Sequence, residues 1–197
     1  NRDLLYRPIA LTSYRLVRTV AGPHPLPQHL VNLLLHALVA ALLVRLCRRM
    51  GLSEAISLAA GVLFAVLPIH SEVVASVVGR ADILATLGVL LALLAHRRSL
   101  VAASPSTTAC WRIVAAVAAF VAMGAKENGV SVIPLVVVWD AFQTRSRRAS
   151  DAGPNWWGWS TLRRLIYLLA PAAVYFGLRY FALEGHLYQR PALTKTV

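Results

Sequence analysis

Six apolar stretches, separated by clusters of arginine, constrain this chain more than any other feature. They cover roughly residues 28–46, 54–69, 83–96, 111–125, 128–143 and 163–182. A straight membrane-spanning helix needs about 20 apolar residues, with a range of about 17–25. Because several of these stretches are shorter, we expect their helices to extend into the flanking segments. The pattern predicts an all-α, polytopic transmembrane bundle of about six spanning helices, with short interfacial helices on the non-cytoplasmic side.

The composition fits a protein whose solvent is lipid. Hydrophobic residues make up 58% of the 197 residues and charged residues only 14%, whereas soluble domains contain about 45–50% apolar residues. The net charge of +12 raises the possibility of a nucleic-acid partner. However, the basic residues punctuate the apolar stretches and form no separate basic stripe. We therefore expect a lipid bilayer as the partner and no nucleic acid.

The arginines also predict the orientation of the bundle. One set of helix ends carries Arg45, Arg48, Arg49, Arg97, Arg98, Arg112, Arg145, Arg147, Arg148, Arg163 and Arg164. The alternate short loops carry only Arg80 and Lys126. Because cytoplasmic loops are enriched in Lys and Arg, we expect the arginine-rich ends to be cytoplasmic. This divides the chain into a non-cytoplasmic loop with an interfacial helix (1–27), the helix bundle (28–182) and a non-cytoplasmic tail (183–197).

Two connecting segments carry further expectations. Between residues 124 and 129 the chain is too polar for the middle of a bilayer, which predicts a tight hairpin at the membrane face rather than one long broken helix. The arginine-rich segment 145–162 contains Trp156, Trp157 and Trp159, which we interpret as anchors at the membrane interface. The two cysteines, Cys47 and Cys110, show no metal-ligand spacing.

Gln28, Asn32 and His36 lie four residues apart and therefore stack along one face of the first spanning helix. Polar residues inside a bilayer are costly and are functional candidates for that reason. Two interpretations remain open. The three side chains either form hydrogen bonds with a neighbouring helix or line a polar cavity.

Residues 70–82 hold an unusual density of ionisable groups: His70, Glu72, Arg80 and Asp82. Built as one helix, Glu72, Ser76 and Arg80 lie within about 80° of one another, and valines occupy the opposite side. This predicts an amphipathic helix at the membrane surface with an acid and a base on its wet face. The alternative is an ordinary interfacial helix.

The hairpin contributes Lys126 and Glu127. They are either solvated turn residues or a site in which Lys126 meets a phosphate, a frequent task of lysine. No nucleophile–base triad, Walker loop, dinucleotide fingerprint or zinc spacing occurs in the sequence. His70 and Glu72 could supply two metal ligands, but two positions apart on a helix they diverge. We therefore predict no metal site.

These residues occur in strings that resemble a known family. The strings are Tyr6-Arg7-Pro8, His29-Leu30-Val31-Asn32-Leu33-Leu34-Leu35-His36-Ala37-Leu38, Pro68-Ile69-His70-Ser71-Glu72-Val73-Val74-Ala75, Val78-Gly79-Arg80-Ala81-Asp82, Ala125-Lys126-Glu127-Asn128-Gly129 and Leu178-Arg179-Tyr180. Together they resemble the membrane half of the transmembrane and tetratricopeptide-repeat (TMTC-like) protein O-mannosyltransferases, which share the GT-C-type membrane fold of lipid-linked sugar transferases. The resemblance covers nearly the whole chain.

The resemblance implies transfer of mannose from a polyprenyl (dolichyl) phosphate carrier to Ser/Thr hydroxyls of an acceptor protein. The donor phosphate would bind Arg80, Lys126 and Arg7. Glu72 and Asp82 would orient the acceptor or the basic side chains, and are weak candidates for a catalytic role. The polar cavity would be formed by Gln28, Asn32, His36, His70, Glu72 and Glu127. The expected location is the endoplasmic reticulum membrane, or the inner membrane in a bacterium.

The chain also departs from the family pattern. The family's catalytic acid lies in the first non-cytoplasmic loop, but the only acid before residue 54 is Asp3. We therefore expect the catalytic acid upstream of Asn1 and no activity of the chain by itself. No tetratricopeptide repeat is recognised. Two other functions stay open: a transporter or flippase for a lipid-linked or anionic solute, and a non-catalytic membrane scaffold.

Overall fold

A computed structural model describes residues 6–147 and 159–187, and within these ranges every regular element is a helix. The elements are α1 (Pro8–Ala21), α2 (Pro25–Arg49), α3 (Glu54–Val66), η1 (Pro68–His70), α4 (Ser71–Ala75), α5 (Arg80–Leu100), α6 (Pro105–Ala125), η2 (Glu127–Ser131), α7 (Val132–Arg147) and α8 (Trp159–Leu187). Each of the six apolar stretches lies largely within a helix. The predicted all-α class is confirmed.

Local sequence signals set several helix starts. Ser53 caps α3 by accepting a hydrogen bond from the amide of Ile56, and Ser104 caps α6 by accepting one from the amide of Thr107. Proline occupies the first turn of α1, α2 and α6, where its missing N–H has no helical partner to lose. Between α2 and α3, Gly51 adopts a φ of 93°, which favours glycine and permits the tight reversal.

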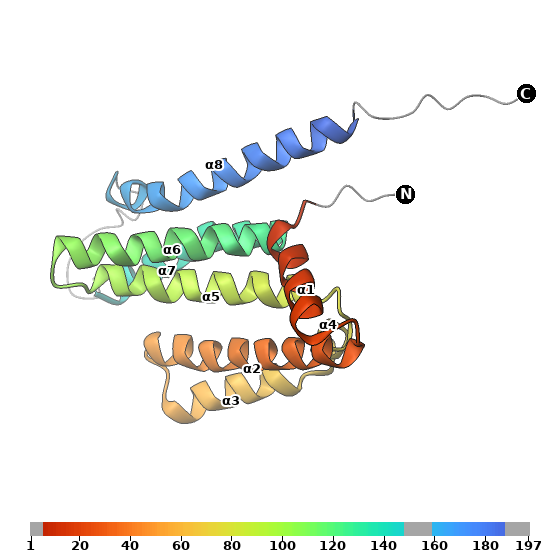
Figure 1. Cartoon of the computed structure of the whole chain (residues 1–197). Helices are drawn as coiled ribbons and strands as arrows, with labels where there is room; N and C mark the ends of the chain where they lie inside the picture. Colours follow the sequence, from red (N-terminus) through yellow and green to blue (C-terminus); the bar gives the residue numbers. More distant parts are fainter. Residues whose placement is uncertain (1–5, 148–158, 188–197) are drawn as a thin grey trace, which may run out of the picture.

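The helices form one bundle with a cap at one end (Figure 1). Helices α5 and α6 lie at its centre, the α2–α3 hairpin flanks α5, and α8 lies against α6 on the other side. α1 runs across one end of the bundle, where α4 also lies. α1 lies in the 1–27 segment, and its place at a membrane interface stays a prediction. The predictions for Trp156, Trp157 and most of the 183–197 tail lie outside the described residues.

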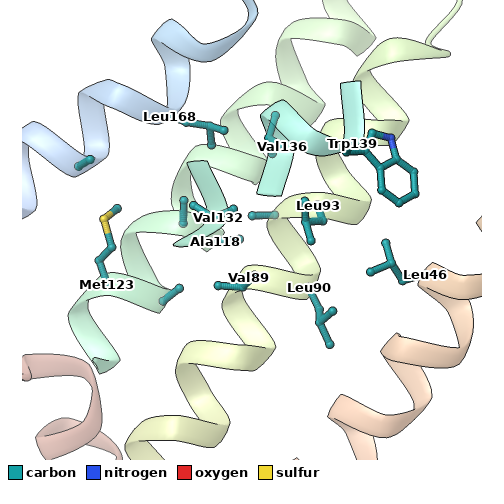
Figure 2. Close-up of a cluster of buried hydrophobic side chains, with 14 of the residues drawn as sticks. Leu46, Val89, Leu90, Leu93, Ala118, Met123, Val132, Val136, Trp139 and Leu168 are labelled. Atoms are coloured by element: carbon teal, nitrogen blue, oxygen red, sulfur yellow. The ribbon is translucent and has the colours of Figure 1, made fainter. Parts of the chain in front are cut away.

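The core lies between α2, α5, α6, α7 and α8, and Figure 2 shows part of it. Its side chains are almost entirely aliphatic or aromatic, and Val132, Val136 and Leu168 have no exposed surface. At the α5–α6 contact, a Cβ on Gly88 would lie 2.8 Å from both the carbonyl oxygen of Ala118 and the Cβ of Ala122. The absence of a side chain there allows the two helix backbones to approach closely.

Four helical segments are long and apolar enough to span a membrane: Pro25–Arg49, Arg80–Leu100, Pro105–Ala125 and Leu165–Leu183. Helix α3 and the η1–α4 segment meet at a 50° bend and would make a fifth span if they cross together. α7 has only 16 residues, which is short for a span. The structure thus supports a membrane bundle of four or five spans within the described ranges, against the six predicted.

The single amphipathic helix predicted over residues 70–82 is wrong. The helix stops at Ala75, Ser76 is extended (φ −85°, ψ 131°), and α5 starts at Arg80. A Cβ on Gly79 would lie 2.0 Å from the carbonyl oxygen of Val73, so the chain folds back on itself at this turn. Glu72 and Arg80 consequently belong to different helices and share no helical face.

Candidate functional site

Charged side chains from four parts of the chain meet at the end of the bundle that α1 crosses. They are Arg7 before α1, Asp82 in the first turn of α5, Lys126 and Glu127 at the α6–η2 junction, and Arg179 in α8. We call these five residues the charged cluster. Three cations and two carboxylates leave the cluster with one net positive charge. Their side chains are between 18% and 40% exposed, so the cluster is partly open.

Glu127 is the centre of one half of the cluster. Arg7 donates from Nε to Glu127 Oε2 at 3.1 Å and from Nη2 to Oε1 at 3.2 Å, which is the bidentate geometry that favours an arginine–carboxylate pair. Arg179 Nη1 lies 3.8 Å from Glu127 Oε2. The hydrogen bond from Arg7 lowers the pKa of Glu127, and the same contact raises the pKa of Arg7. Both groups therefore stay charged at neutral pH.

Lys126 and Asp82 form the other half. Lys126 Nζ donates to Asp82 Oδ1 at 2.5 Å, joining the end of α6 to the start of α5. The backbone at Lys126 is extended (φ −155°, ψ 143°) and turns the chain into η2. A Cβ on Gly129 would lie 2.3 Å from the carbonyl carbon of Ala122, so η2 can fold against α6 only with glycine there. This tight junction directs Lys126 and Glu127 to opposite partners.

Arg80 occupies a different environment from the charged cluster. Its side chain has 0% exposure. It donates from Nε to Asn32 Oδ1 and from Nη2 to the Gln28 carbonyl oxygen, both at 2.7 Å, and from Nη1 to the Ser13 carbonyl oxygen at 3.4 Å. The guanidinium carbon also lies 5.1 Å from the centroid of the Tyr14 ring. Arg80 thus links α1, α2 and α5, and each of its three side-chain nitrogens donates to a protein acceptor.

The polar residues of α2 face neighbouring backbone, as the first of their two interpretations expected. Gln28 donates to the carbonyl oxygen of Tyr14 at 3.4 Å, and Asn32 donates to that of Ser76 at 2.9 Å. His36 Nε2 lies 3.4 Å from the carbonyl oxygen of Ala65. These contacts extend across α1, the α4–α5 turn and α3. Their role as the lining of a substrate cavity stays a prediction.

His70 and Glu72 lie beside this stripe rather than in the charged cluster. The His70 ring is 4.3 Å from the Phe64 ring and 5.5 Å from the His36 ring, measured between centroids. Glu72 is exposed on α4. In the ranges that the structure describes, no hydrogen bond or ion pair joins Glu72 to the charged cluster, and no three His, Cys, Asp or Glu residues are grouped as metal ligands.

A second polar network, absent from the sequence predictions, lies toward the opposite end of the bundle. His96 of α5 is 1% exposed, and its Nε2 lies 2.9 Å from Asp140 Oδ1 of α7. Its Nδ1 lies 2.5 Å from the Tyr167 hydroxyl of α8. None of these three residues was singled out from the sequence. The available signal was Asp140, a carboxylate inside an apolar stretch, which is costly in a membrane unless it is paired.

The described helices and the charged cluster define the class: a polytopic α-helical membrane protein with a partly open, cationic site at one end. Comparison with known proteins is more specific. The chain is 40% identical over 138 residues to "Protein O-mannosyl-transferase tmtc2" of Xenopus laevis, covering 70% of this chain and 16% of that protein. It is 36% identical over 150 residues to human "Protein O-mannosyl-transferase TMTC1", covering 73% and 17%. For human TMTC3 the identity is 34% over 139 residues, covering 70% and 15%.

The chain therefore belongs to the TMTC family, as its sequence strings indicated. It spans about a sixth of the length of these curated relatives. No family model matches the chain, and no solved structure matches it significantly.

Proposed function

We propose that the chain is part of a membrane O-mannosyltransferase and that the charged cluster binds the phosphate of a polyprenyl-phosphate mannose donor. The relatives' names support mannosyl transfer to protein. The observation that carries the proposal is the composition of the cluster: three cations against two carboxylates, partly open, at one end of a bundle built for lipid. An isoprenoid donor needs both features, because its tail requires lipid and its phosphate requires cations.

The chemistry assigns the cations a clear task. Transfer breaks the bond between C1 of mannose and the phosphate oxygen, and forms a bond from C1 to the Ser/Thr hydroxyl oxygen, whose proton passes to a base. Negative charge grows on the departing phosphate, and preorganised cations at that position stabilise the transition state. Arg7 and Lys126 carry this role in our proposal, with Arg179 as a third cation that the sequence strings contained but the site prediction omitted.

The carboxylates take positioning roles in this proposal. Asp82 holds Lys126 Nζ at 2.5 Å, and Glu127 holds Arg7 through two hydrogen bonds. Each carboxylate fixes one cation and lowers the conformational freedom lost when the phosphate arrives. Neither is assigned as the base that accepts the hydroxyl proton. Glu72 is exposed on the neighbouring α4 and would orient the acceptor.

We assign Arg80 to positioning rather than to direct phosphate contact. Its guanidinium is buried and bonded to Asn32 and the backbone, so a phosphate would have to displace these acceptors to reach it. Arg80 begins α5, and Asp82 lies two residues further along the same first turn. By fixing the first turn of α5 against α1 and α2, Arg80 fixes the carboxylate that holds Lys126.

The same proposal implies an orientation of the bundle in the membrane. The arginine-rich ends of α2 and α5 would face the cytoplasm, and the charged cluster would face the opposite compartment, which is the endoplasmic reticulum lumen in a eukaryote. The distribution of arginine supports this orientation. The predicted six spans would require α3 with α4, and α7, to cross as well.

The test is Lys126→Gln in the full-length protein, assayed for mannose transfer from dolichyl phosphate mannose to an acceptor peptide. We expect transfer to fall by about 10- to 100-fold, since a hydrogen bond to a charged group contributes about 1.5–3 kcal/mol. Lys126→Arg should restore part of the activity. Arg18→Gln is the matched control, because Arg18 is an exposed cation of α1 outside the cluster. Unchanged transfer by Lys126→Gln, with normal membrane insertion, would refute the proposal.

A further inference from the structure

An apolar groove runs along the bundle between the C-terminal half of α2 and helices α5 and α6. Its volume is about 580 Å³. Its floor and walls include Leu84, Leu87, Leu91, Val114, Val117 and Val121. Several of these side chains are exposed, including Leu91 at 42% and Val117 at 57%. The groove lies outside the charged cluster and shares no residue with it.

Four arginines surround one end of this groove. Arg45 and Arg49 come from the last turns of α2, and Arg97 and Arg98 come from the last turn of α5. Within the described residues, no carboxylate forms an ion pair with any of the four. Trp111 of α6 lines the same end, and its ring lies 5.7 Å from the guanidinium carbon of Arg98. An indole beside a cation is typical of the headgroup level of a membrane.

The groove is long enough to take an acyl chain of one leaflet. From Leu84 to Arg97 the helix rises by about 20 Å, at 1.5 Å per residue. A leaflet contributes about half of a hydrocarbon core that is about 30 Å thick. The groove therefore offers an apolar track that is longer than one leaflet is deep, and a group of arginines without a paired carboxylate at its end.

We infer that this groove binds one anionic phospholipid, with the headgroup phosphate against Arg45, Arg49, Arg97 and Arg98 and an acyl chain along the apolar floor. The two parts of the groove together select the ligand: the arginines require an anion, and the leucine and valine walls require hydrocarbon. Basic pockets between helices are a recognised form of anionic lipid site. Arg98 and Trp111 would contact the headgroup. The four guanidinium groups supply enough donors for several phosphate oxygens.

The donor of the proposed transfer reaction is a different ligand at a different place. Asp82 of the charged cluster and Arg97 of the groove are separated by about 22 Å along α5, which places them at opposite ends of the helix. The headgroup of a lipid in the groove and the phosphate of a donor at the cluster would thus lie at opposite ends of α5. The inference does not depend on mannosyl transfer, and it would stand if that proposal failed.

The test uses the full-length protein, extracted from vesicles of equal parts phosphatidylglycerol and phosphatidylcholine and examined by native mass spectrometry. We expect the wild type to retain one phosphatidylglycerol in preference to phosphatidylcholine. Arg97→Gln with Arg98→Gln should weaken retention by about 30-fold, since each basic residue near an anionic lipid surface contributes about fivefold. Arg48→Gln is the matched control, because Arg48 lies at the same end of α2 but contacts Glu54 outside the groove.

A second variant separates lipid binding from folding. Leu91→Trp keeps all four arginines and fills part of the groove, so it should reduce retention while leaving the melting temperature of the delipidated protein unchanged. Equal retention of both lipids, or full retention by the Arg97/Arg98 double variant, would overturn the inference. Preferential retention of added polyprenyl phosphate would overturn it too, because the groove would then be a donor site. Cross-linking of Leu91 to another segment of the full chain would show that protein covers the groove.

Discussion

Arg80 shows how one buried charge can organise a membrane-embedded structure. A guanidinium shielded from water is costly unless its donors are satisfied. Here Asn32 and two backbone carbonyl groups accept from it, and the Tyr14 ring covers its face. Since these partners come from α1 and α2, the contacts that satisfy Arg80 also fix the position of the two helices relative to α5.

This arrangement predicts that Arg80→Ala acts mainly on stability. Asn32 Oδ1 would lose its donor, and the Gln28 carbonyl oxygen would keep only its helical partner; a buried group left unpaired costs about 1–3 kcal/mol. We expect a loss of about 3 kcal/mol, seen as a lower melting temperature of the purified protein in detergent. Arg80→Lys should recover less than half of it, because one ammonium cannot span acceptors on α1 and α2.

A substitution of Lys126 should have the opposite balance of effects on stability and activity. Lys126→Gln removes a partly exposed contact and should change the melting temperature less than Arg80→Ala does, while reducing transfer. If Arg80→Ala instead melts like the wild type and loses donor binding, Arg80 contacts the phosphate directly, as the sequence resemblance implied.

Individual site residues were predictable only in part. Lys126 and Glu127 stand out because a charged pair in a hairpin between apolar stretches is unusual. Their partners do not stand out, because Arg7 is 120 positions from Glu127 and Asp82 is 44 positions from Lys126. His96 and Tyr167, 71 positions apart, likewise meet only through helix packing. Spacing rules detect neighbours within one helix and contain no information about such pairs.

At the scale of elements, apolar length located every long helix, but it could not locate the break between α4 and α5. The apolar and polar positions continue with helical periodicity from residue 70 to residue 82. Tertiary contacts interrupt this periodicity. Asn32 donates a hydrogen bond to the carbonyl oxygen of Ser76, and Gly79 packs against the backbone of Val73. A polar group on another helix thus outweighs the local preference, and it moves Arg80 from a surface helix into the bundle.

The packing of α5 against α6 depends on Gly88. Substituting this glycine should therefore affect stability differently from substituting Gly177, a glycine of α8 with open space around it. Gly88→Ala would place a methyl group 2.8 Å from Ala118 O and Ala122 Cβ, and forcing such contacts costs about 1–3 kcal/mol. Gly177→Ala in α8 meets no atom within 4 Å, so only the helix preference for alanine, about 1 kcal/mol, remains.

We therefore expect the two substitutions to shift the melting temperature in opposite directions. Thermal unfolding of the detergent-purified protein, followed by circular dichroism, measures both shifts. A Gly88→Ala protein as stable as the Gly177→Ala protein would show that α5 and α6 do not approach this closely.

At the scale of the molecule, the bundle separates two kinds of positive charge. At the end crossed by α1, the cations are largely matched by carboxylates and one charge remains over. At the other end, arginines of α2 and α5 line a groove with no matching acid in the described residues. The paired end is suited to holding a specific anion, and the unpaired end is suited to the anionic leaflet that fixes the orientation of the bundle.

This separation predicts that the two ends face opposite sides of the membrane, which thiol labelling can measure. Cys110 is exposed near the start of α6, at the arginine-rich end, whereas Ile69 is exposed in η1 at the other end. In full-length protein with its remaining cysteines removed, Cys110 should react with a membrane-impermeant maleimide only from the cytoplasmic side. Ile69→Cys, with Cys110→Ala, should react only from the opposite side. Reaction of both positions from one side would mean that α5 does not cross the bilayer between them. The charged cluster could then not face a different compartment from the arginine groove.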